Sequence, residues 1–539
     1  MDSDQLTIDR MMSRPRREFG DRRVISIVDG QTVEMTYRTF FARVDRLAWA
    51  LRDAGIKSGD RVGTVAWNHH RHLELYVAVT GIGAVLHTVN ARLSAEQLIE
   101  VITHADDALV FVDSDLLDAV DAVVSSGRPV VRLGAAQADR HTPLPDYESL
   151  LADQPDGSYD YPIVTEGQPA ATSYSSATTG RPKGVVYTHR AIYLHSMMLS
   201  MADTWAISGT DTILPVVPMF HVNAWGLPFA ALWTGATLVL PGERPTAATI
   251  TGLLADHQIT FAAAVPTVWM NVFETARRTG ADLSALRLVV SGGGPLTAPV
   301  LKLADALSIP LIQSYGMTEA TPLVLVGVAA DQAPPEVTDT DDLRLKQGRV
   351  VPGLEYRVEA HGRPVPRDGQ TAGELLLRGP WVAESYERDE RSDTAFEDGW
   401  YHTGDLVTID AHGYLRVVDR MTDLIKSGGE WISSLELESA LLEHPAIDSA
   451  VVVAVPDDRW QERPRAFIVS NRNPLPKSDI RSFLAERFPK FWIPDMFVEI
   501  DAVPQTSVGK IDKKSLRARA VSPQPATHPA TSPNHEEVR

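Results

Sequence analysis

The sequence predicts an α/β protein. We expect a large N-terminal domain of doubly wound α/β subdomains plus a small β-rich subdomain, followed by a small, mobile α+β C-terminal domain. Three observations support this prediction. The chain has 539 residues, too many for one compact core, and 44% of them are apolar. Short apolar runs also alternate with helical stretches, which is typical of parallel strands joined by crossover helices.

Two sets of alternating elements build the expected large domain. In the first set, strands are expected at residues 62–67, 84–89 and 108–112, and helices at residues 73–82 and directly after Ser94. In the second set, strands are expected at residues 212–217, 236–240, 260–265, 286–290 and 310–313, with helical spacers between them. Both sets indicate parallel sheets covered by helices.

The rest of the chain changes in character. Residues 331–342 combine paired prolines with clustered acids and predict a surface loop. Short strands are expected at 374–377 and 414–418 in the β-rich subdomain, and at 450–455 and 466–469 in an α+β module. We therefore expect domains at 1–420 and 421–520. The tail, 521–539, is rich in Pro, Ser and Thr and is expected to be disordered because it has little to bury.

Composition excludes several classes of function. The chain carries 51 Lys and Arg against 70 Asp and Glu, a formal charge of −19, which disfavours nucleic acid as a partner. It has no cysteine, so disulfides, thiolate catalysis and Cys-ligated metals are excluded. No apolar run reaches the roughly 18 residues that a membrane span requires. We therefore expect a cytoplasmic protein without an integral membrane segment.

One loop has the composition of a phosphate-binding site. Residues 174–185 read YSSATTGRPKGV and crowd five hydroxyl side chains, two glycines and a lysine into a short stretch. Backbone N–H groups, hydroxyls and a cation together suit a polyphosphate. The Gly-Lys-Ser/Thr of a Walker A loop is absent, so this is a different phosphate loop. We expect it to bind a nucleotide through Thr178, Thr179, Gly180 and Lys183.

Four further segments each follow an expected parallel strand directly. They are residues 218–221 (PMFH), 265–267 (VPT), 291–294 (SGGG) and 315–319 (YGMTE). Ligands of open α/β sheets bind outside the carboxyl ends of the strands, so we expect these segments to form one pocket. The glycines let backbone approach a flat base, and Tyr315 offers a stacking face. Glu319 supplies the oxygen ligand that Mg²⁺ on a triphosphate prefers.

These motifs resemble the adenylate-forming superfamily of acyl-CoA synthetases, luciferases and peptide-synthetase adenylation domains. The resemblance covers roughly residues 36–517. Its strongest part, residues 217–242 (VPMFHVNAWGLPFAALWTGATLVLPG), is similar to the fatty-acyl-CoA synthetase branch. The resemblance implies ATP, Mg²⁺ and CoA as cofactor and co-substrates, and it is compatible with a homodimer.

The resemblance also implies roles for individual residues. Thr178 and Glu319 would hold Mg²⁺ and act in catalysis. The remaining nucleotide contacts would come from Val222, Gly292, Gly293, Gln313, Ser314, Tyr315, Gly316, Thr318, Asp405, Arg420, Lys426 and Trp431. His221, Trp225 and Gly292 would bind the acyl group, with His221 also catalytic and Trp225 acting as a gate. Thr422 would be the hinge between domains, and Lys510 the catalytic lysine of the small domain.

The reaction implied is attack of a carboxylate on the α-phosphate of ATP, which releases pyrophosphate, followed by transfer of the acyl group to CoA. A cation is needed where these anions meet, which supports Lys510 on physical grounds. The acid would be a medium- or long-chain fatty acid. The alternative is an aryl or specialised-metabolite acid, with transfer to a carrier protein or another nucleophile. Val222 and Asn223 follow His221 where amino-acid-activating domains usually place an Asp, so an amino acid is less favoured.

A rival of another class is a catalytically silent acyl- or nucleotide-binding protein, which the presence of Lys510, Glu319 and Asp405 disfavours. Three positions depart from the pattern of the superfamily. Ala177 replaces a glycine of the phosphate loop, and Thr422 replaces the usual Lys or Asp of the hinge. Ala264 replaces the glycine before Val-Pro-Thr, which is expected to trim the acyl pocket.

Overall fold

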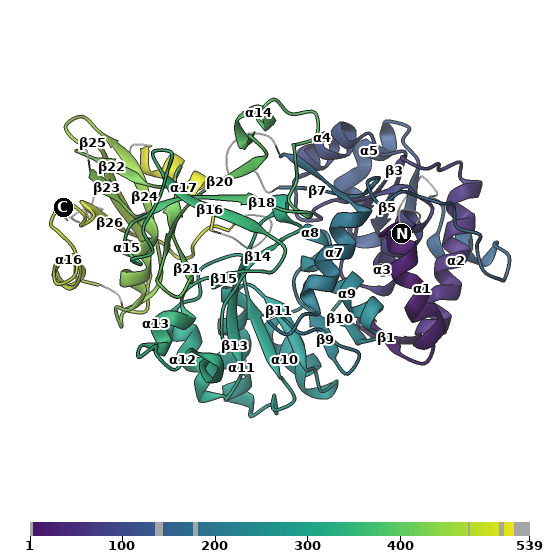
Figure 1. The fold of residues 1–539 in the computed structure, drawn as a ribbon, viewed down its shortest axis with the longest axis horizontal. Coiled ribbons are helices and arrows are strands. Elements are labelled where there is room, and N and C mark those ends of the chain that lie inside the picture. The colour runs from purple at the N-terminus through teal and green to yellow at the C-terminus, as the bar shows by residue number, and fades with distance from the viewer. Residues whose placement is uncertain are drawn as a thin grey trace, which may run out of the picture. The chain divides into compact units, whose positions relative to one another are not determined.

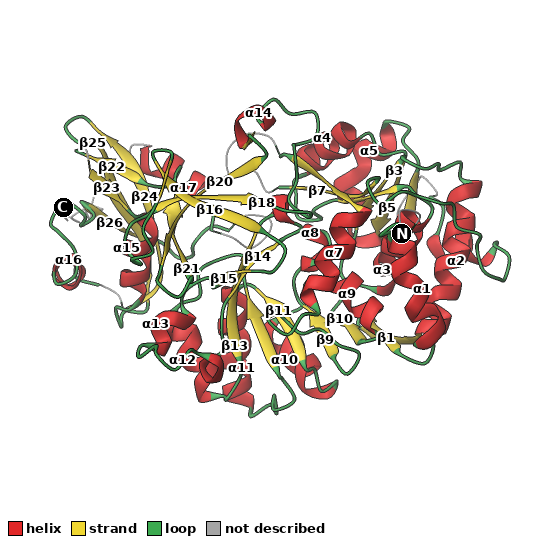
Figure 2. Cartoon of the chain, viewed as in Figure 1, coloured by secondary structure: helices red, strands yellow, loops and turns green. Residues whose placement is uncertain are grey.

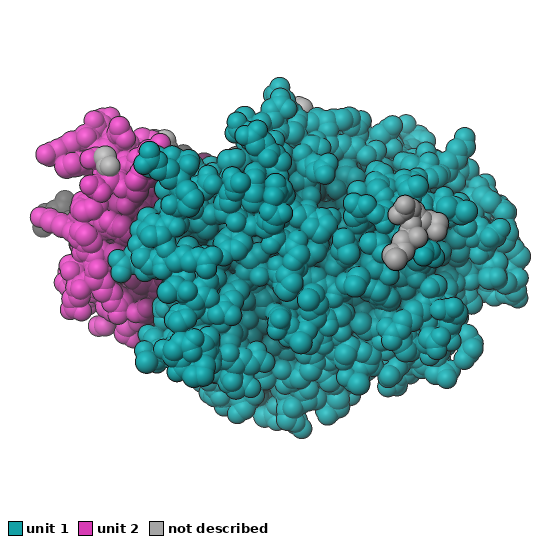
Figure 3. All heavy atoms as spheres, in the orientation of Figure 1, with its two compact units in different colours: residues 1–422, 505–510 teal, residues 423–504, 511–539 magenta. Residues whose placement is uncertain are grey.

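The computed structural model describes residues 4–134, 144–175, 182–428, 430–472, 475–505 and 511–521. The described chain divides into two compact units, coloured separately in Figure 3. Of the described residues, the larger unit comprises those up to Thr422 and Gln505, and the smaller unit comprises Asp423–Pro504 and Ile511–Val521. Figures 1 and 2 show their helices and strands.

The first sheet of the larger unit has six strands in the order β6-β5-β3-β4-β7-β8. Its strands are β3 (Arg61–Val65), β4 (Val85–Thr88), β5 (Leu109–Asp113), β6 (Val130–Leu133), β7 (Pro169–Tyr174) and β8 (Gly184–Thr188). The helical elements around it are α2 (Tyr37–Asp53), α3 (His70–Gly81), α4 (Ala95–Ala105), η1 (Ser114–Val120), α5 (Asp121–Ser125), α6 (Tyr147–Ala152) and α7 (His189–Leu199). Ser94 begins α4 as predicted, through a reciprocal capping box with Gln97. The pairs from β6 to β7 are parallel, and β8 pairs antiparallel with β7.

The second sheet has nine strands in the order β15-β14-β13-β12-β11-β9-β10-β1-β2. Its strands are β1 (Arg23–Val28), β2 (Gln31–Thr36), β9 (Thr212–Pro215), β10 (Thr237–Leu240), β11 (Phe261–Ala264), β12 (Leu288–Ser291), β13 (Leu311–Gly316), β14 (Leu323–Val326) and β15 (Arg349–Val350). The helical elements are α1 (Ile8–Glu18), α8 (Val222–Trp225), α9 (Leu227–Thr234), α10 (Ala247–Asp256), α11 (Pro266–Thr279), α12 (Ala298–Ala306), η2 (Thr318–Ala320), η3 (Ala330–Gln332) and α13 (Thr340–Arg344).

Both faces of the second sheet are buried. In β11, Ala263 packs into one hydrophobic core, whereas Ala262 and Ala264 pack into another. Val289 and Val290 in β12 divide in the same way. Successive side chains of a strand point to opposite faces, so the sheet lies between two cores. This arrangement, with helices supplying both cores, confirms the predicted doubly wound α/β class.

A small β-rich subdomain completes the larger unit. It contains β16 (Glu355–Ala360), β17 (Arg363–Pro364), β18 (Gly373–Arg378), α14 (Ser392–Ala395), β19 (Phe396–Glu397), β20 (Trp400–Ile409) and β21 (Leu415–Arg420). The surface loop predicted at 331–342 is wrong in part, because η3 and α13 each overlap one end of it. Asp339 caps α13 by accepting the Asp342 N–H, and Leu343 is buried beneath the turn.

The smaller unit is an α+β fold. It contains β22 (Ile425–Ser427), β23 (Glu430–Ile432), α15 (Ser434–Leu442), β24 (Ile447–Asp457), β25 (Gln461–Ser470), α16 (Lys477–Ala485), β26 (Met496–Glu499) and α17 (Lys513–Val521). Buried Glu438 joins three elements, because it accepts the Val452 N–H and pairs with Lys513 at 2.8 Å. The core of this unit is separate from those of the larger unit.

The observed elements lie close to the predicted ones. Among the predicted strands of the two large sheets, β13 is extended most, to Gly316, because its carboxyl end pairs antiparallel with β14. The predicted tail falls outside the described residues from 522 onward. Across the part of the chain that the structure describes, no helix combines the length and hydropathy needed to span a bilayer.

Candidate functional site

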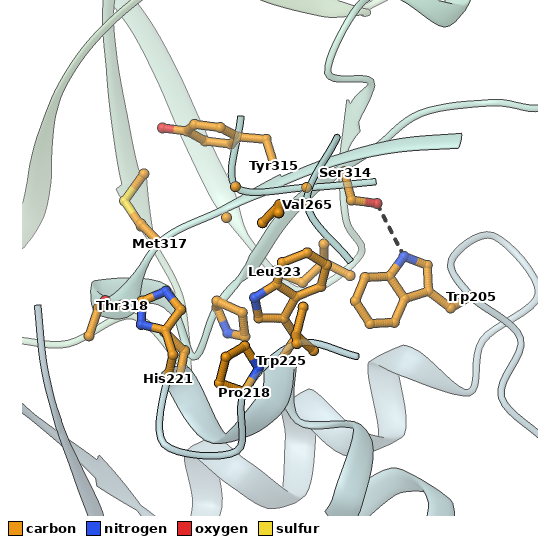
Figure 4. Close-up of a pocket in the computed structure, with 16 residues that line it drawn as sticks. Trp205, Pro218, His221, Trp225, Val265, Ser314, Tyr315, Met317, Thr318 and Leu323 are labelled. Atoms are coloured by element: carbon orange, nitrogen blue, oxygen red, sulfur yellow. Dashed lines mark hydrogen bonds between the residues drawn. The ribbon is translucent and has the colours of Figure 1, made fainter. Parts of the chain in front are cut away.

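A cavity of about 60 Å³ lies at the carboxyl ends of β9, β11, β12 and β13. It is lined by Trp205, Val217, Pro218, His221, Val222, Trp225, Val265, Gly292, Gly293, Ser314, Tyr315, Gly316, Met317, Thr318, Pro322 and Leu323. All four strand-end segments contribute to this lining, so their predicted convergence is confirmed (Figure 4). The cavity also gathers most of the predicted nucleotide- and acyl-binding residues of the larger unit.

The sheet topology explains the position of this cavity. The chain leaves β9 for β10 on one side and then returns to β11 on the other side. Neighbouring crossovers therefore diverge at β9 and β11, which opens a crevice at their carboxyl ends. Pro218 follows the first of these strands and Val265 the second, and both line the cavity.

Trp225 stands on an unusual piece of backbone. The four residues of α8 form a left-handed turn, with φ of 46°, 51°, 48° and 58° from Val222 to Trp225. A left-handed conformation costs a non-glycine residue about 1–2 kcal/mol. Gly226 ends the turn at φ 78°, where a Cβ would lie 2.7 Å from His195 Nδ1. The turn is therefore strained and held by its surroundings.

Gly292 permits the Trp225 ring to approach the strand end. A Cβ at Gly292 would lie 2.9 Å from Cη2 of Trp225 and 3.1 Å from the Ser314 carbonyl oxygen. A side chain there would displace the indole. Ala262, Ala263 and Gly226, which are also small, do not line this cavity. Ala264 packs into the hydrophobic core on the face of the sheet opposite to Ala263 and does not line the cavity. The expectation that Ala264 trims the acyl pocket is therefore wrong for this cavity.

Glu319 follows the cavity lining directly and is tightly held. The Tyr386 hydroxyl donates to Glu319 Oε1 at 2.8 Å, and the Ala383 N–H donates to the Glu319 carbonyl at 2.7 Å. Oε2 accepts no hydrogen bond from the residues that the structure describes. The carboxylate is thus oriented with one oxygen left for a ligand, which fits an Mg²⁺ ion on a triphosphate.

Lys183 lies next to this carboxylate. Its ammonium sits 4.3 Å from the centre of the Tyr386 ring, the same tyrosine that binds Glu319. Burial lowers the pKa of Lys183 below its ordinary value, and the nearby Glu319 charge opposes that shift. Lys183, Tyr386 and Glu319 therefore form one cluster that contains a cation and a carboxylate.

Asp405 forms a second polar cluster at the same strand end. It is 3% exposed, accepts a hydrogen bond from the Tyr315 hydroxyl and pairs with Arg420 at 3.1 Å. Burial, with the Asp405 carboxylate, holds the pKa of Tyr315 well above its ordinary value, so the phenol stays a donor. The Arg420 side chain is 50% exposed, which leaves part of its guanidinium accessible.

Gln313 precedes the cavity lining on β13. Its side chain is buried, and its Oε1 has no hydrogen-bond partner among the described residues. The neighbouring strand places Ser291 opposite it, and the Ser291 hydroxyl is also buried without a partner in the described chain. Both residues are in register with Ala264, on the face of the sheet away from this cavity, and neither lines it. The nucleotide contact expected from Gln313 therefore stays a prediction.

The described part of the larger unit does not place several of the predicted site residues in this cavity. Thr178, Thr179 and Gly180, together with Ala177 and Lys510, lie outside the described residues. Lys426 and Trp431 belong to the smaller unit, on β22 and β23, and both are exposed. The Lys426 ammonium lies 4.8 Å from the centre of the Trp431 ring. Thr422 is an exposed residue at the end of the larger unit.

Sequence reasoning missed Trp205 and Tyr386. Tyr386 follows an irregular stretch between β18 and α14, and no motif marks it. Trp205 precedes β9 and lines the cavity beside Ser314 (Figure 4). Its Nε1–H donates to Ser314 Oγ at 3.2 Å, and the residue is only 1% exposed. Its proximity to the Trp225 ring, 6.4 Å between centroids, depends on the fold alone.

Comparison with known proteins gives matches over nearly the whole chain. The family described as AMP-binding enzyme matches residues 13–387, and the AMP-binding enzyme C-terminal domain matches residues 436–510. The long-chain-fatty-acid–CoA ligase of Thermus thermophilus is 39% identical over 525 residues, which are 96% of each chain. The medium-chain-fatty-acid–CoA ligase of Ectopseudomonas oleovorans is 38% identical over 530 residues, again 96% of each chain. The crystal structure of ATP-bound MatB from Rhodopseudomonas palustris has a TM-score of 0.82 and 25% identity, covering 96% of this chain and 99% of that chain.

Proposed function

Because the chain belongs to the AMP-binding enzyme family, we propose that it is an AMP-forming acid–CoA ligase. It activates a carboxylic acid with ATP and then transfers the acyl group to CoA. The observation that carries this proposal is the cavity at the switch point. There an apolar wall that contains Trp205 and Trp225 meets the carboxyl end of β13. Glu319, held by Tyr386, follows this strand end, and Asp405 accepts a hydrogen bond from Tyr315 on it.

The acid is proposed to be a fatty acid of medium or long chain. Apolar groups supply much of the lining, including Val217, Trp225 and Leu323, and they suit an aliphatic tail. The two fatty-acid–CoA ligases that resemble the chain over 96% of its length support the same substrate class. A charged side chain on the acid is disfavoured by this lining.

The first half-reaction forms the acyl-adenylate. A carboxylate oxygen attacks the α-phosphorus of ATP in line, and the bond from that phosphorus to pyrophosphate breaks. Glu319 with Thr178 would hold Mg²⁺, which would supply positive charge to offset that of the triphosphate. Tyr386 keeps the Glu319 carboxylate in position, while Lys183 contributes a positive charge beside it. Asp405 and Arg420 are proposed to bind the ribose hydroxyls, and Tyr315 to stack on the base.

The second half-reaction forms the thioester. The CoA thiolate attacks the acyl carbonyl, the bond to the adenylate oxygen breaks, and AMP leaves with that oxygen. His221, at the cavity edge beside Thr318 in Figure 4, is proposed to shape the acyl and thioester site. We assign Lys510 to the first half-reaction and Lys426 to the second, with Thr422 as the hinge residue between the two domains.

Location and assembly complete the proposal. The enzyme is proposed to be a cytoplasmic homodimer that acts on small molecules, without a nucleic acid partner. Light scattering of the purified protein would give twice the mass of one 59.0 kDa chain if the dimer forms. A monomer mass would remove this part of the proposal without affecting the reaction.

The test of the function is a panel of acids assayed with Mg·ATP and CoA. Straight-chain acids from butyrate to palmitate, with benzoate and cinnamate as aryl controls, are scored for AMP, pyrophosphate and acyl-CoA. The proposal predicts all three products, in equal amounts, with straight-chain acids. Pyrophosphate and acyl-adenylate without acyl-CoA would indicate another acceptor. Release of ADP instead of AMP would contradict the proposal.

A further inference from the structure

Trp205 and Trp225 form two aromatic barriers in series along the cavity. In Figure 4 the Trp225 indole lies between His221 on one side and Trp205 on the other. Given the proposed acid–CoA ligase function, we infer that Trp205 is the fixed stop that sets the longest acyl chain the enzyme accepts, behind Trp225 as the movable barrier. Trp205 is thus a specificity-determining residue for the tail of the acid.

Trp205 is fixed by contacts on three sides. Its indole N–H donates to Ser314 Oγ on β13, and its ring lies 5.7 Å from the centre of the Phe261 ring on β11. Its carbonyl accepts two N–H groups of Arg287, at 3.1 and 3.2 Å. Arg287 is in turn paired with Asp211 at 2.6 Å. Moving the Trp205 ring would leave a buried indole N–H without its partner, which is unfavourable.

Trp225 is held differently. It stands on the left-handed turn of Val222–Trp225, where four consecutive non-glycine residues have positive φ. Strained backbone of this kind is common where a segment has two arrangements. The side chain contacts Gly292, which offers no side chain to hold the ring. A shift of this turn can therefore relieve strain, whereas a shift of Trp205 cannot.

The volume of the cavity shows how the two indoles limit the length of the acyl tail. With both indoles in place it measures about 60 Å³, which is room for roughly four to six groups the size of water or a methylene. For comparison, an engineered apolar cavity of about 150 Å³ binds one benzene molecule. A longer tail therefore requires Trp225 to move aside, and it then extends until it meets the Trp205 ring.

The inference predicts a break in the chain-length profile. Each buried methylene is worth about fourfold in kcat/KM, so the rate constant should rise with each carbon until the tail reaches Trp205. Beyond that point the rise should stop. In Trp205→Ala and Trp205→Leu, the rise should continue to acids at least two carbons longer. The smaller Leu change keeps the test available if the Ala variant does not fold.

Trp269→Leu is the matched control. Trp269 is a buried tryptophan of the same sheet region, its Nε1–H donates to the Val290 carbonyl at 2.9 Å, and it does not line the cavity. The panel of acids from butyrate to palmitate is assayed by pyrophosphate release for all variants, with thermal unfolding measured alongside. A break that moves in both Trp205 variants but not in the control supports the inference.

An unmoved break in folded Trp205→Leu, or an equal move in Trp269→Leu, would overturn the inference and leave the proposed function standing. A wild-type enzyme that releases no pyrophosphate with any acid of the panel would overturn both. The two failures are therefore distinguished by the wild-type enzyme alone.

Discussion

The two compact units present their chemical groups in opposite ways. In the larger unit, Glu319 and Asp405 are buried and held by Tyr386 and Tyr315 at the ends of a sheet. In the smaller unit, Lys426 is exposed on a short hairpin, and the Trp431 beside it is 51% exposed. Buried, oriented groups suit binding of a ligand in one geometry, whereas an exposed lysine suits a group that acts at one step only. Substitutions in the two units are therefore expected to affect the reaction in different ways.

The largest effect is expected from Lys510. Lys510→Ala should lower acyl-adenylate formation by about 10²–10³-fold, because a cation aimed at developing charge acts on that transition state. Thioester formation from supplied acyl-adenylate should be nearly unchanged. ATP–pyrophosphate exchange measures the first half-reaction, and acyl-CoA production from synthetic adenylate measures the second.

Lys426→Ala is the paired variant and should show the reverse pattern. Its side chain is exposed, so its removal should change the free energy of unfolding by no more than about 0.5 kcal/mol. Equal losses in both half-reactions for both variants would mean that one fixed arrangement performs the two steps. The assignment of the two lysines to different steps would then be wrong.

Glu319→Gln tests the role of a buried carboxylate in the larger unit. The variant keeps the shape of the side chain and removes its charge, so adenylation should fall by about 10- to 100-fold and the Mg²⁺ requirement should rise. Tyr386→Phe is the control, because it removes the hydrogen bond to Glu319 Oε1 and keeps the carboxylate. It should show a smaller loss. Wild-type activity of Glu319→Gln at limiting Mg²⁺ would show that Glu319 only stabilises the loop.

Trp225→Ala should alter selectivity more than affinity for ATP. Loss of the indole opens the passage towards Trp205, so longer acids should gain several-fold in kcat/KM, at about fourfold per methylene buried. Acid-independent ATP turnover should also rise, because water enters the open cavity. The KM for ATP should stay within about twofold, since the indole faces the acyl side. An unchanged chain-length profile would make Trp225 an ordinary core residue.

The smallest expected effect is a pH dependence at Lys183. Burial lowers the pKa of this lysine, so it loses its charge at a lower pH than an ordinary lysine does. The KM for ATP should therefore rise several-fold as the pH increases from about 7 towards 10. Lys183→Arg keeps its charge over this range and should remove most of that rise. The same rise in both enzymes would place the titrating group elsewhere.

Sequence patterns predicted the fold well because the signals are local. Apolar runs placed β3, β4 and β5 of the first sheet and β9 to β13 of the second, and Ser94 marked the start of α4. The other strands of these sheets were not predicted. The strand-end rule predicted that the segments at His221, Gly292 and Tyr315 would meet, since it follows from parallel topology alone.

The rest of the site depends on contacts that no local pattern records. Trp205 and Ser314 are 109 residues apart in the chain, and Tyr386 is 67 residues from Glu319. The left-handed turn at Val222–Trp225 has no glycine before Gly226 to indicate positive φ. Tertiary packing, rather than residue type, imposes that conformation.

The most direct test of the proposed reaction follows oxygen atoms. The enzyme is incubated with ATP, CoA and a fatty acid whose carboxylate carries heavy oxygen, and the products are examined by mass spectrometry. Attack of the carboxylate on the α-phosphorus, followed by attack of the thiolate on the acyl carbonyl, must leave one heavy oxygen in AMP and none in pyrophosphate. Heavy oxygen in pyrophosphate or inorganic phosphate, or AMP without label, would contradict an acyl-adenylate intermediate and with it the proposed two-step reaction.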